Sequence, residues 1–184
     1  MNACTPQPSK NTTEKEIIFI DQHLAKFIDT SFIYRYRSFF ASIDYSLNVR
    51  RDTIAVSVWH EMLPLNEHLH YLPKLFRAAK LEKFLSVFTD TVKKSSAAKL
   101  DFSRLNKIGR IKFSSRKFSL KHKVVPGTIG DLQFYRVLFD KKNQYAVTMV
   151  RYWTGPVAAV LKLYLFEQKN GQWRKVKEEI IEQS

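Results

Sequence analysis

The stretch VAAVLKLYLFEQKNGQWRKVKEEII, residues 157–181, is the most informative part of the chain about its fold. Apolar residues alternate through its first half, which is typical of a β-strand with one buried face. These residues are Val157, Ala159, Leu161, Leu163 and Leu165. The dipeptide Asn170-Gly171 then separates two runs of strand character, and Asn-Gly favours a two-residue hairpin turn. The stretch therefore predicts a β-hairpin.

Further strand-like runs precede this hairpin, at residues 132–139 and 145–153. Only a few residues separate successive runs, and parallel neighbours need a crossover of about a dozen residues. We therefore expect an antiparallel meander. Farther upstream, Ile111 and Phe113 alternate, and Phe118 and Leu120 continue with the phase slipped by one residue, as a β-bulge requires.

The N-terminal half has helical periodicity instead. From Glu14 onward, apolar residues recur at spacings of three and four, which predicts an amphipathic helix. They are Ile17, Ile20, Leu24, Phe27 and Ile28. Similar stripes lie within residues 32–47 and 75–88, whereas residues 53–59 fit a strand or a helix equally well. The pattern predicts an α+β fold in which the N-terminal helices cover the sheet face that carries Leu161.

We expect a single domain over residues 15–184, after a flexible tether over residues 1–14. The closing run FEQKNGQWRKV, residues 166–176, and the order of helices before a sheet resemble the nuclear-transport-factor-like, cystatin-type cone superfamily. The resemblance implies a curved, cone-like sheet. That superfamily includes enzymes, binding modules and secretion-machine parts, and its enzymes place an Asp, His or Tyr in the pocket. By residue type, Asp44, His60 and Tyr135 are the candidates here.

The one cysteine of the chain, Cys4, follows Ala3 and precedes a polar, proline-containing stretch. This segment resembles the mature start of a bacterial lipoprotein, which implies lipidation at Cys4 and a location in the cell envelope. The alternative is a cytoplasmic protein with a frayed N-terminus. A single cysteine leaves no internal disulfide and no cysteine-based zinc site.

Positive charge is concentrated in residues 93–123, where eleven Lys or Arg and one Asp carry +10 of the formal net charge of +14. Such a segment steers anionic partners. The residues that we expect to bind the partner are Lys107, Arg110, Lys112, Arg116, Lys117, Lys121 and Lys123. The partner would be an acidic protein surface or anionic lipid. Nucleic acid is an alternative, because aromatic residues such as Phe113 and Phe118 could stack on bases, and a solubilising surface is another.

Sequence motifs of catalysis are missing: there is no phosphate-binding glycine loop and no nucleophile elbow. His60, His68 and His70 are the only cluster of potential metal ligands, and surface or capping histidines explain them better. We expect no cofactor and no metal. The leading hypothesis is a non-enzymatic, envelope-associated binding or scaffold protein, in a larger assembly or as an immunity-type partner. The alternatives are a cytosolic nucleic-acid-binding module and a small-molecule enzyme whose pocket walls include Trp59 and Trp153.

Overall fold

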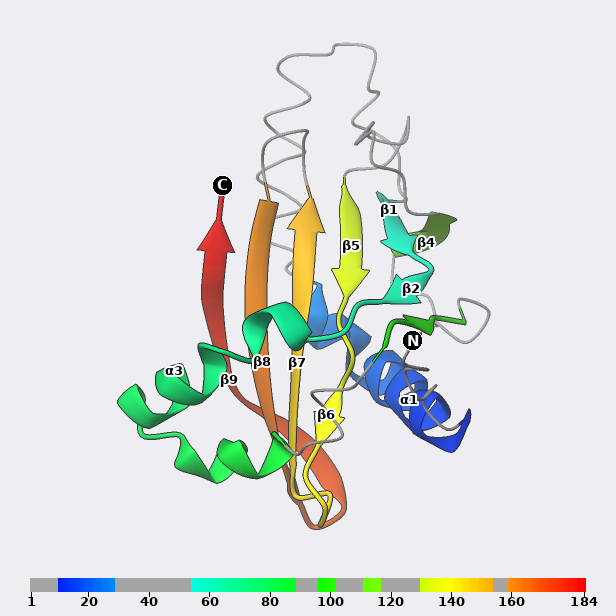
Figure 1. Ribbon diagram of the computed structural model, residues 1–184. Helices are drawn as coiled ribbons and strands as arrows, with labels where there is room; N and C mark the ends of the chain where they lie inside the picture. The colour runs from blue at the N-terminus through cyan, green and yellow to red at the C-terminus, as the bar shows by residue number, and fades with distance from the viewer. Residues whose placement is uncertain (1–9, 29–53, 89–95, 102–110, 117–129, 154–158) are drawn as a thin grey trace, which may run out of the picture.

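The computed structural model describes residues 10–28, 54–88, 96–101, 111–116, 130–153 and 159–184, which form a large mixed sheet with helices (Figure 1). The strands lie in the order β4 (Ile111–Arg116), β1 (Ile54–Trp59), β5 (Asp131–Phe134), β7 (Tyr145–Trp153), β8 (Ala159–Lys169) and β9 (Gln172–Gln183). The short β6 (Leu138–Phe139) also pairs with β7, and β2 (Glu61–Met62) pairs with β3 (Ala98–Lys99). The predicted α+β class is confirmed.

Two helices and two 3₁₀ helices accompany the sheet in the described residues. They are α1 (Lys10–Phe27), α3 (Leu72–Ala78), η1 (Asn66–His68) and η2 (Glu82–Val87). Helix α1 begins at Lys10, within the segment expected to be a tether, and the predicted stripe of residues 32–47 lies outside the described residues. Among the described helices, none combines the length and the apolar character that a membrane crossing needs.

The meander is antiparallel from β5 to β9, as predicted. The hairpin between β8 and β9 turns at Asn170 and Gly171, whose φ angles are 51° and 75°. Two consecutive residues with positive φ are the requirement of a type I′ turn, which matches the twist of the strands on either side. The Asn-Gly signal therefore identified the hairpin correctly.

Strand β1 does not belong to the antiparallel meander. It runs parallel to both of its neighbours, with Ile54 opposite Ile111 of β4 and Ser57 opposite Asp131 of β5. Alternation shows which residues share a face, but it carries no information about the direction of a neighbouring strand. Residues 54–59, for which the sequence left strand and helix open, are thus a strand inside a mixed sheet.

The predicted strand over residues 132–139 is interrupted. Phe134 of β5 lies opposite Val150 and Leu138 of β6 lies opposite Val147, so three residues of one strand face two of the other. This is the geometry of a β-bulge, which redirects side chains. The backbone of Leu63 fills the gap, since its amide donates to the Phe134 carbonyl (3.0 Å) and its carbonyl accepts from the Arg136 amide (2.8 Å).

Both faces of the sheet are covered, because β8 is buried without a break from Val160 to Phe166. Helix α1 packs on the face that carries Tyr164 and Phe166, where the rings of Phe27 and Tyr164 meet edge to face at 5.0 Å. Of the helices expected to cover the Leu161 face, α1 therefore lies on the other face. The Leu161 face packs against α3 and η2.

The helix expected over residues 75–88 is split in two. Helix α3 ends at Ala78, Lys80 takes a φ of 55°, and the chain continues as η2 from Glu82. A left-handed residue reverses the chain at the end of a helix. The reversal lets the two short segments bury Phe76 and Phe84 against the same sheet face.

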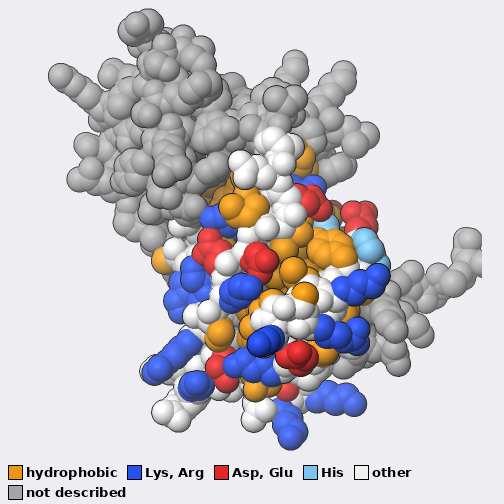
Figure 2. Space-filling model, turned by 90° about the vertical axis from the view of Figure 1, so that its left-hand side faces the viewer, with side chains coloured by type: hydrophobic (Ala, Val, Ile, Leu, Met, Phe, Trp, Pro, Cys, Tyr) orange, Lys and Arg blue, Asp and Glu red, His pale blue; other side chains and the backbone are white. Residues whose placement is uncertain are grey.

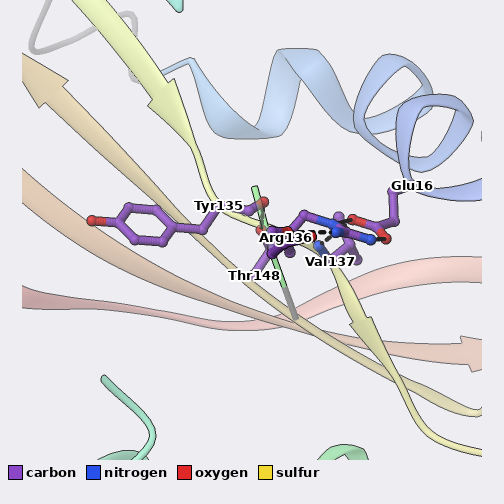
Figure 3. Close-up of polar contacts among 6 residues, drawn as sticks. Glu16, Tyr135, Arg136, Val137 and Thr148 are labelled. Carbon is purple, nitrogen blue, oxygen red and sulfur yellow. Dashed lines mark hydrogen bonds and ion pairs between the residues drawn. The ribbon is translucent and has the colours of Figure 1, made fainter. Parts of the chain in front are cut away.

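A buried ion pair attaches α1 to the β-bulge (Figure 3). Glu16 is 1% exposed and Arg136 is 4% exposed. The guanidinium donates from Nε to Oε2 (2.7 Å) and from Nη2 to Oε1 (2.5 Å), and the Val137 amide also donates to Oε2 (3.0 Å). A third guanidinium nitrogen donates to the Ser96 carbonyl (2.8 Å). Every charged atom of the pair thus has a partner, which a buried charge requires.

Replacement of Arg136 by Met should destabilise the protein by roughly 3–5 kcal/mol, because it leaves the Glu16 carboxylate buried without its counter-charge. The measurement is urea unfolding at neutral pH. Lys169→Met is the matched control, since Lys169 is 61% exposed and 3.5 Å from Glu167, and it should cost at most about 1 kcal/mol. Equal losses in the two variants would contradict the structural role of the buried pair.

Candidate functional site

Most of the residues predicted to bind an anionic partner lie outside the described residues. These are Lys107, Arg110, Lys117, Lys121 and Lys123, and Cys4 also lies outside. The backbone of the other two is described, because Lys112 and Arg116 belong to β4, opposite Ala55 and Trp59 of β1. Within the described residues β4 is the terminal strand of the sheet and pairs with β1 alone.

The glutamates of β9, at the other end of the sheet, are engaged locally. Glu178 accepts from Lys162 (2.8 Å) and Lys175 (2.5 Å), and Glu179 lies 2.7 Å from Lys177. Seen from the side of β9, Lys, Arg, Asp and Glu side chains are intermixed over the surface (Figure 2). Burial acts to raise the pKa of Glu178, but the hydrogen bonds from its two lysines outweigh it and lower that pKa. These acidic side chains are thus matched by lysines of β8 and β9.

A second group of polar side chains lies on the sheet face that α3 and η2 cover. Nδ1 of His68 is 2.8 Å from the Tyr71 hydroxyl and 3.8 Å from Oε1 of Glu182. Nη2 of Arg151 donates to the other oxygen of Glu182 (2.7 Å). The ring of Tyr135 meets the His68 ring edge to face, with 5.3 Å between centroids. Residues of η1, β5–β6, β7 and β9 thus converge on one point.

Burial sets the protonation states in this group. It lowers the pKa of His68, and the nearby Glu182 carboxylate opposes the shift only in part. Burial also raises the pKa of Tyr71 to about 12 and raises that of Tyr135. At neutral pH the imidazole is therefore neutral and both phenols keep their protons. Tyr135, which the sequence offers by residue type as a pocket acid or base, thus keeps its proton and is suited to donate a hydrogen bond.

The other candidates for catalysis and metal binding do not assemble into a centre. Nε2 of His60 lies 3.7 Å from Oε1 of Glu61, and Asp44 lies outside the described residues. In the part of the chain that the structure describes, no three His, Cys, Asp or Glu side chains are grouped so that they could hold a metal ion. His68 is the predicted metal-ligand candidate that the fold places in a polar cluster.

Sequence reasoning missed Arg151 and Glu182. Their contact crosses β8, because Arg151 and Glu182 both lie beside Leu161 in the register of the sheet. The sequence does hold one signal for this contact: Arg151 interrupts the apolar run of β7, at a position on the face that α3 and η2 cover. Only the pairing of three strands shows that a glutamate near the end of the chain meets it.

Comparisons with protein-family models, with curated proteins and with solved structures find no match for this chain. The resemblance to the nuclear-transport-factor-like superfamily, the cone-like shape and the envelope location therefore stay predictions.

The lowered pKa of His68 predicts a loss of stability in acid. In the unfolded chain a histidine titrates near pH 6.5, so the unfolded chain binds a proton at His68 more readily than the folded protein does. The stability that the neutral His68 side chain contributes is therefore complete above about pH 6.5. It is lost as the pH falls through the pKa of His68 in the folded protein. Urea unfolding from pH 7 to pH 5 should show a smaller loss for His68→Gln than for the unmodified protein.

Two other histidines make this experiment selective. Burial also lowers the pKa of His23, so part of the acid loss should remain in His68→Gln. The exposed His70 is the control, and His70→Gln should keep the full pH dependence. An unchanged pH dependence in His68→Gln would show that the buried imidazole does not stay neutral in the folded protein.

Proposed function

We propose that this chain is a non-enzymatic binding or scaffold protein that docks an acidic protein partner through its basic segment, residues 93–123. One observation carries the proposal: this segment holds +10 of the net charge of +14, while the glutamates of β9 are matched by cations of β7, β8 and β9. The positive charge is therefore not cancelled by that acidic strand. Its field attracts an anionic partner and weakens as salt screens it.

The position of β4 favours a protein over other polyanions. This strand lies inside the basic segment and ends the strand order among the described residues. A terminal strand offers backbone N–H and C=O groups that an extended peptide can pair with, in the manner of strand addition. Neither a lipid headgroup nor a nucleic acid can continue such a ladder.

The envelope location is a separate part of the proposal and depends on Cys4. A lipid chain at that residue would act together with the polybasic segment, since one acyl chain holds a protein only weakly to a membrane. Mass spectrometry of the native protein from its host tests this part. An unmodified Cys4 would remove the lipid anchor and would leave the docking proposal standing.

Charge reversal tests the docking itself. We expect the full chain to bind poly-L-glutamate with an affinity that falls as the salt concentration rises. A fourfold charge-reversal variant should bind the polymer at least tenfold more weakly, a loss of about 1.4 kcal/mol of binding free energy. Its substitutions are Lys112→Glu, Arg116→Glu, Lys117→Glu and Lys121→Glu. The matched control reverses four exposed lysines outside the segment, Lys26, Lys74, Lys141 and Lys142, for the same change in net charge. The measurement is fluorescence anisotropy of the labelled polymer.

The control variant distinguishes a binding surface from net charge. Equal weakening in both variants would show that overall charge alone attracts the polymer and would overturn the proposal. Parallel titrations with phosphatidylglycerol vesicles and with labelled oligonucleotides test the other two polyanions. The chain could bind the vesicles or the oligonucleotides more tightly than poly-L-glutamate, with that binding lost in the charge-reversal variant of the basic segment and kept in the control variant. This result would show that the partner is a membrane or a nucleic acid and not a protein.

A further inference from the structure

The end of the covered sheet face where β1 finishes and β5 begins is polar, unlike the leucine-rich centre of that face. Gln133 lies opposite Arg151, and Asp131 lies opposite both Ser57 and Trp153. Paired residues of neighbouring strands point to the same side of a sheet. All five side chains therefore share the face that carries Leu161, which pairs with Arg151.

Three buried polar atoms in this region have no hydrogen-bond partner among the described residues. They are Oγ of Ser57, Oε1 of Gln133 and Nε2 of His68. The three residues are 0%, 1% and 4% exposed. Buried polar groups in folded proteins almost always have a partner, and one without a partner destabilises the fold. Their gathering at one end of one face indicates a place for a bound molecule.

The chemistry of Gln133 defines what such a molecule must offer. Its amide nitrogen donates to the carbonyls of Glu61 (2.6 Å) and Phe134 (3.3 Å), so its oxygen is the atom left over. An amide oxygen only accepts hydrogen bonds. The partner must therefore bring an N–H or O–H donor. Ser57 and His68 impose no conflicting demand, because a hydroxyl and a neutral imidazole can each donate or accept.

The surroundings favour an uncharged molecule with an aromatic body. Trp153 lies on the same face with the Arg151 guanidinium 5.7 Å from its ring, and Tyr135 packs on the His68 ring. Arg151 and Glu182 already neutralise one another at 2.7 Å. Aromatic walls with a few fixed polar groups are typical of small-molecule sites.

We propose that this end of the sheet face binds a neutral small molecule with an aromatic body and at least one N–H or O–H donor, held by Gln133, Ser57 and His68. The site is independent of the docking proposal, since none of these residues belongs to the basic segment. Ligand binding here and partner binding at residues 93–123 can each fail without the other.

Tryptophan fluorescence provides the test. The chain has three tryptophans, and Trp173 packs on the opposite face against α1, so Trp173→Phe leaves Trp59 and Trp153 as reporters. Benzamide is the probe. Methyl benzoate is its matched analogue without an N–H donor, and benzoate is the matched analogue that carries a negative charge. We expect a saturable response to benzamide at about millimolar concentration, as for a small fragment. Methyl benzoate should bind about fivefold more weakly, the loss of one hydrogen bond, and benzoate more weakly still, because it also brings a charge into a buried site.

Gln133→Met, made in the Trp173→Phe background, should weaken benzamide binding about fivefold because it removes the acceptor. It also removes the hydrogen bonds that the amide nitrogen donates to Glu61 and Phe134, so unchanged binding of methyl benzoate is required to show that the site keeps its shape. Gln144→Met is the control, since Gln144 is exposed in the hairpin between β6 and β7, and it should bind all three probes as the background does. Thermal unfolding in the presence of benzamide gives a second readout that does not depend on fluorescence. A response that never saturates, or equal benzamide binding by Gln133→Met and its control, overturns the proposal.

Discussion

The ion pair of Glu16 and Arg136 is the interaction on which the arrangement of the molecule depends. It joins α1, the backbone at Ser96 and the β-bulge between β5 and β6, which are far apart in the sequence. Burial raises the pKa of Glu16, while the hydrogen bonds and the charge of Arg136 act against that rise. A buried pair of this kind adds little stability over an apolar pair of the same shape. Loss of either partner would leave the other charge buried alone, so the pair ties α1 to the β-bulge.

The same β-bulge also serves the opposite face. Figure 3 shows Tyr135 and Arg136 pointing to opposite sides of the strand, with Arg136 toward α1. Tyr135 thereby reaches His68, and its backbone carbonyl accepts from the Thr148 hydroxyl (3.1 Å). One interruption in the strand thus both anchors a helix and places an aromatic ring in the polar cluster. This links the stability of the fold to the geometry of the candidate ligand site.

Predictions of strands and helices succeeded where they rest on interactions between residues close in the sequence, and failed where the contacts join distant segments. The Asn170-Gly171 hairpin and the buried stripe of α1 were predictable, because turn geometry and helical periodicity are local. The cover of the Leu161 face was not, since β8 is apolar on both faces and its pattern does not say which helix packs where. The parallel pairing of β1 was hidden for a related reason, as both of its partners lie more than fifty residues away along the chain.

The same division holds for function. Composition and residue order sufficed for the α+β class, the run of strands from β5 to β9 and the concentration of positive charge in residues 93–123, because each is a property of one segment. The His68 cluster and the three buried polar atoms arose only when β1, β5, β7 and β9 came together on one sheet face. Strand pairing brings residues together by register across the fold, and register depends on the whole core and not on any one stretch of sequence.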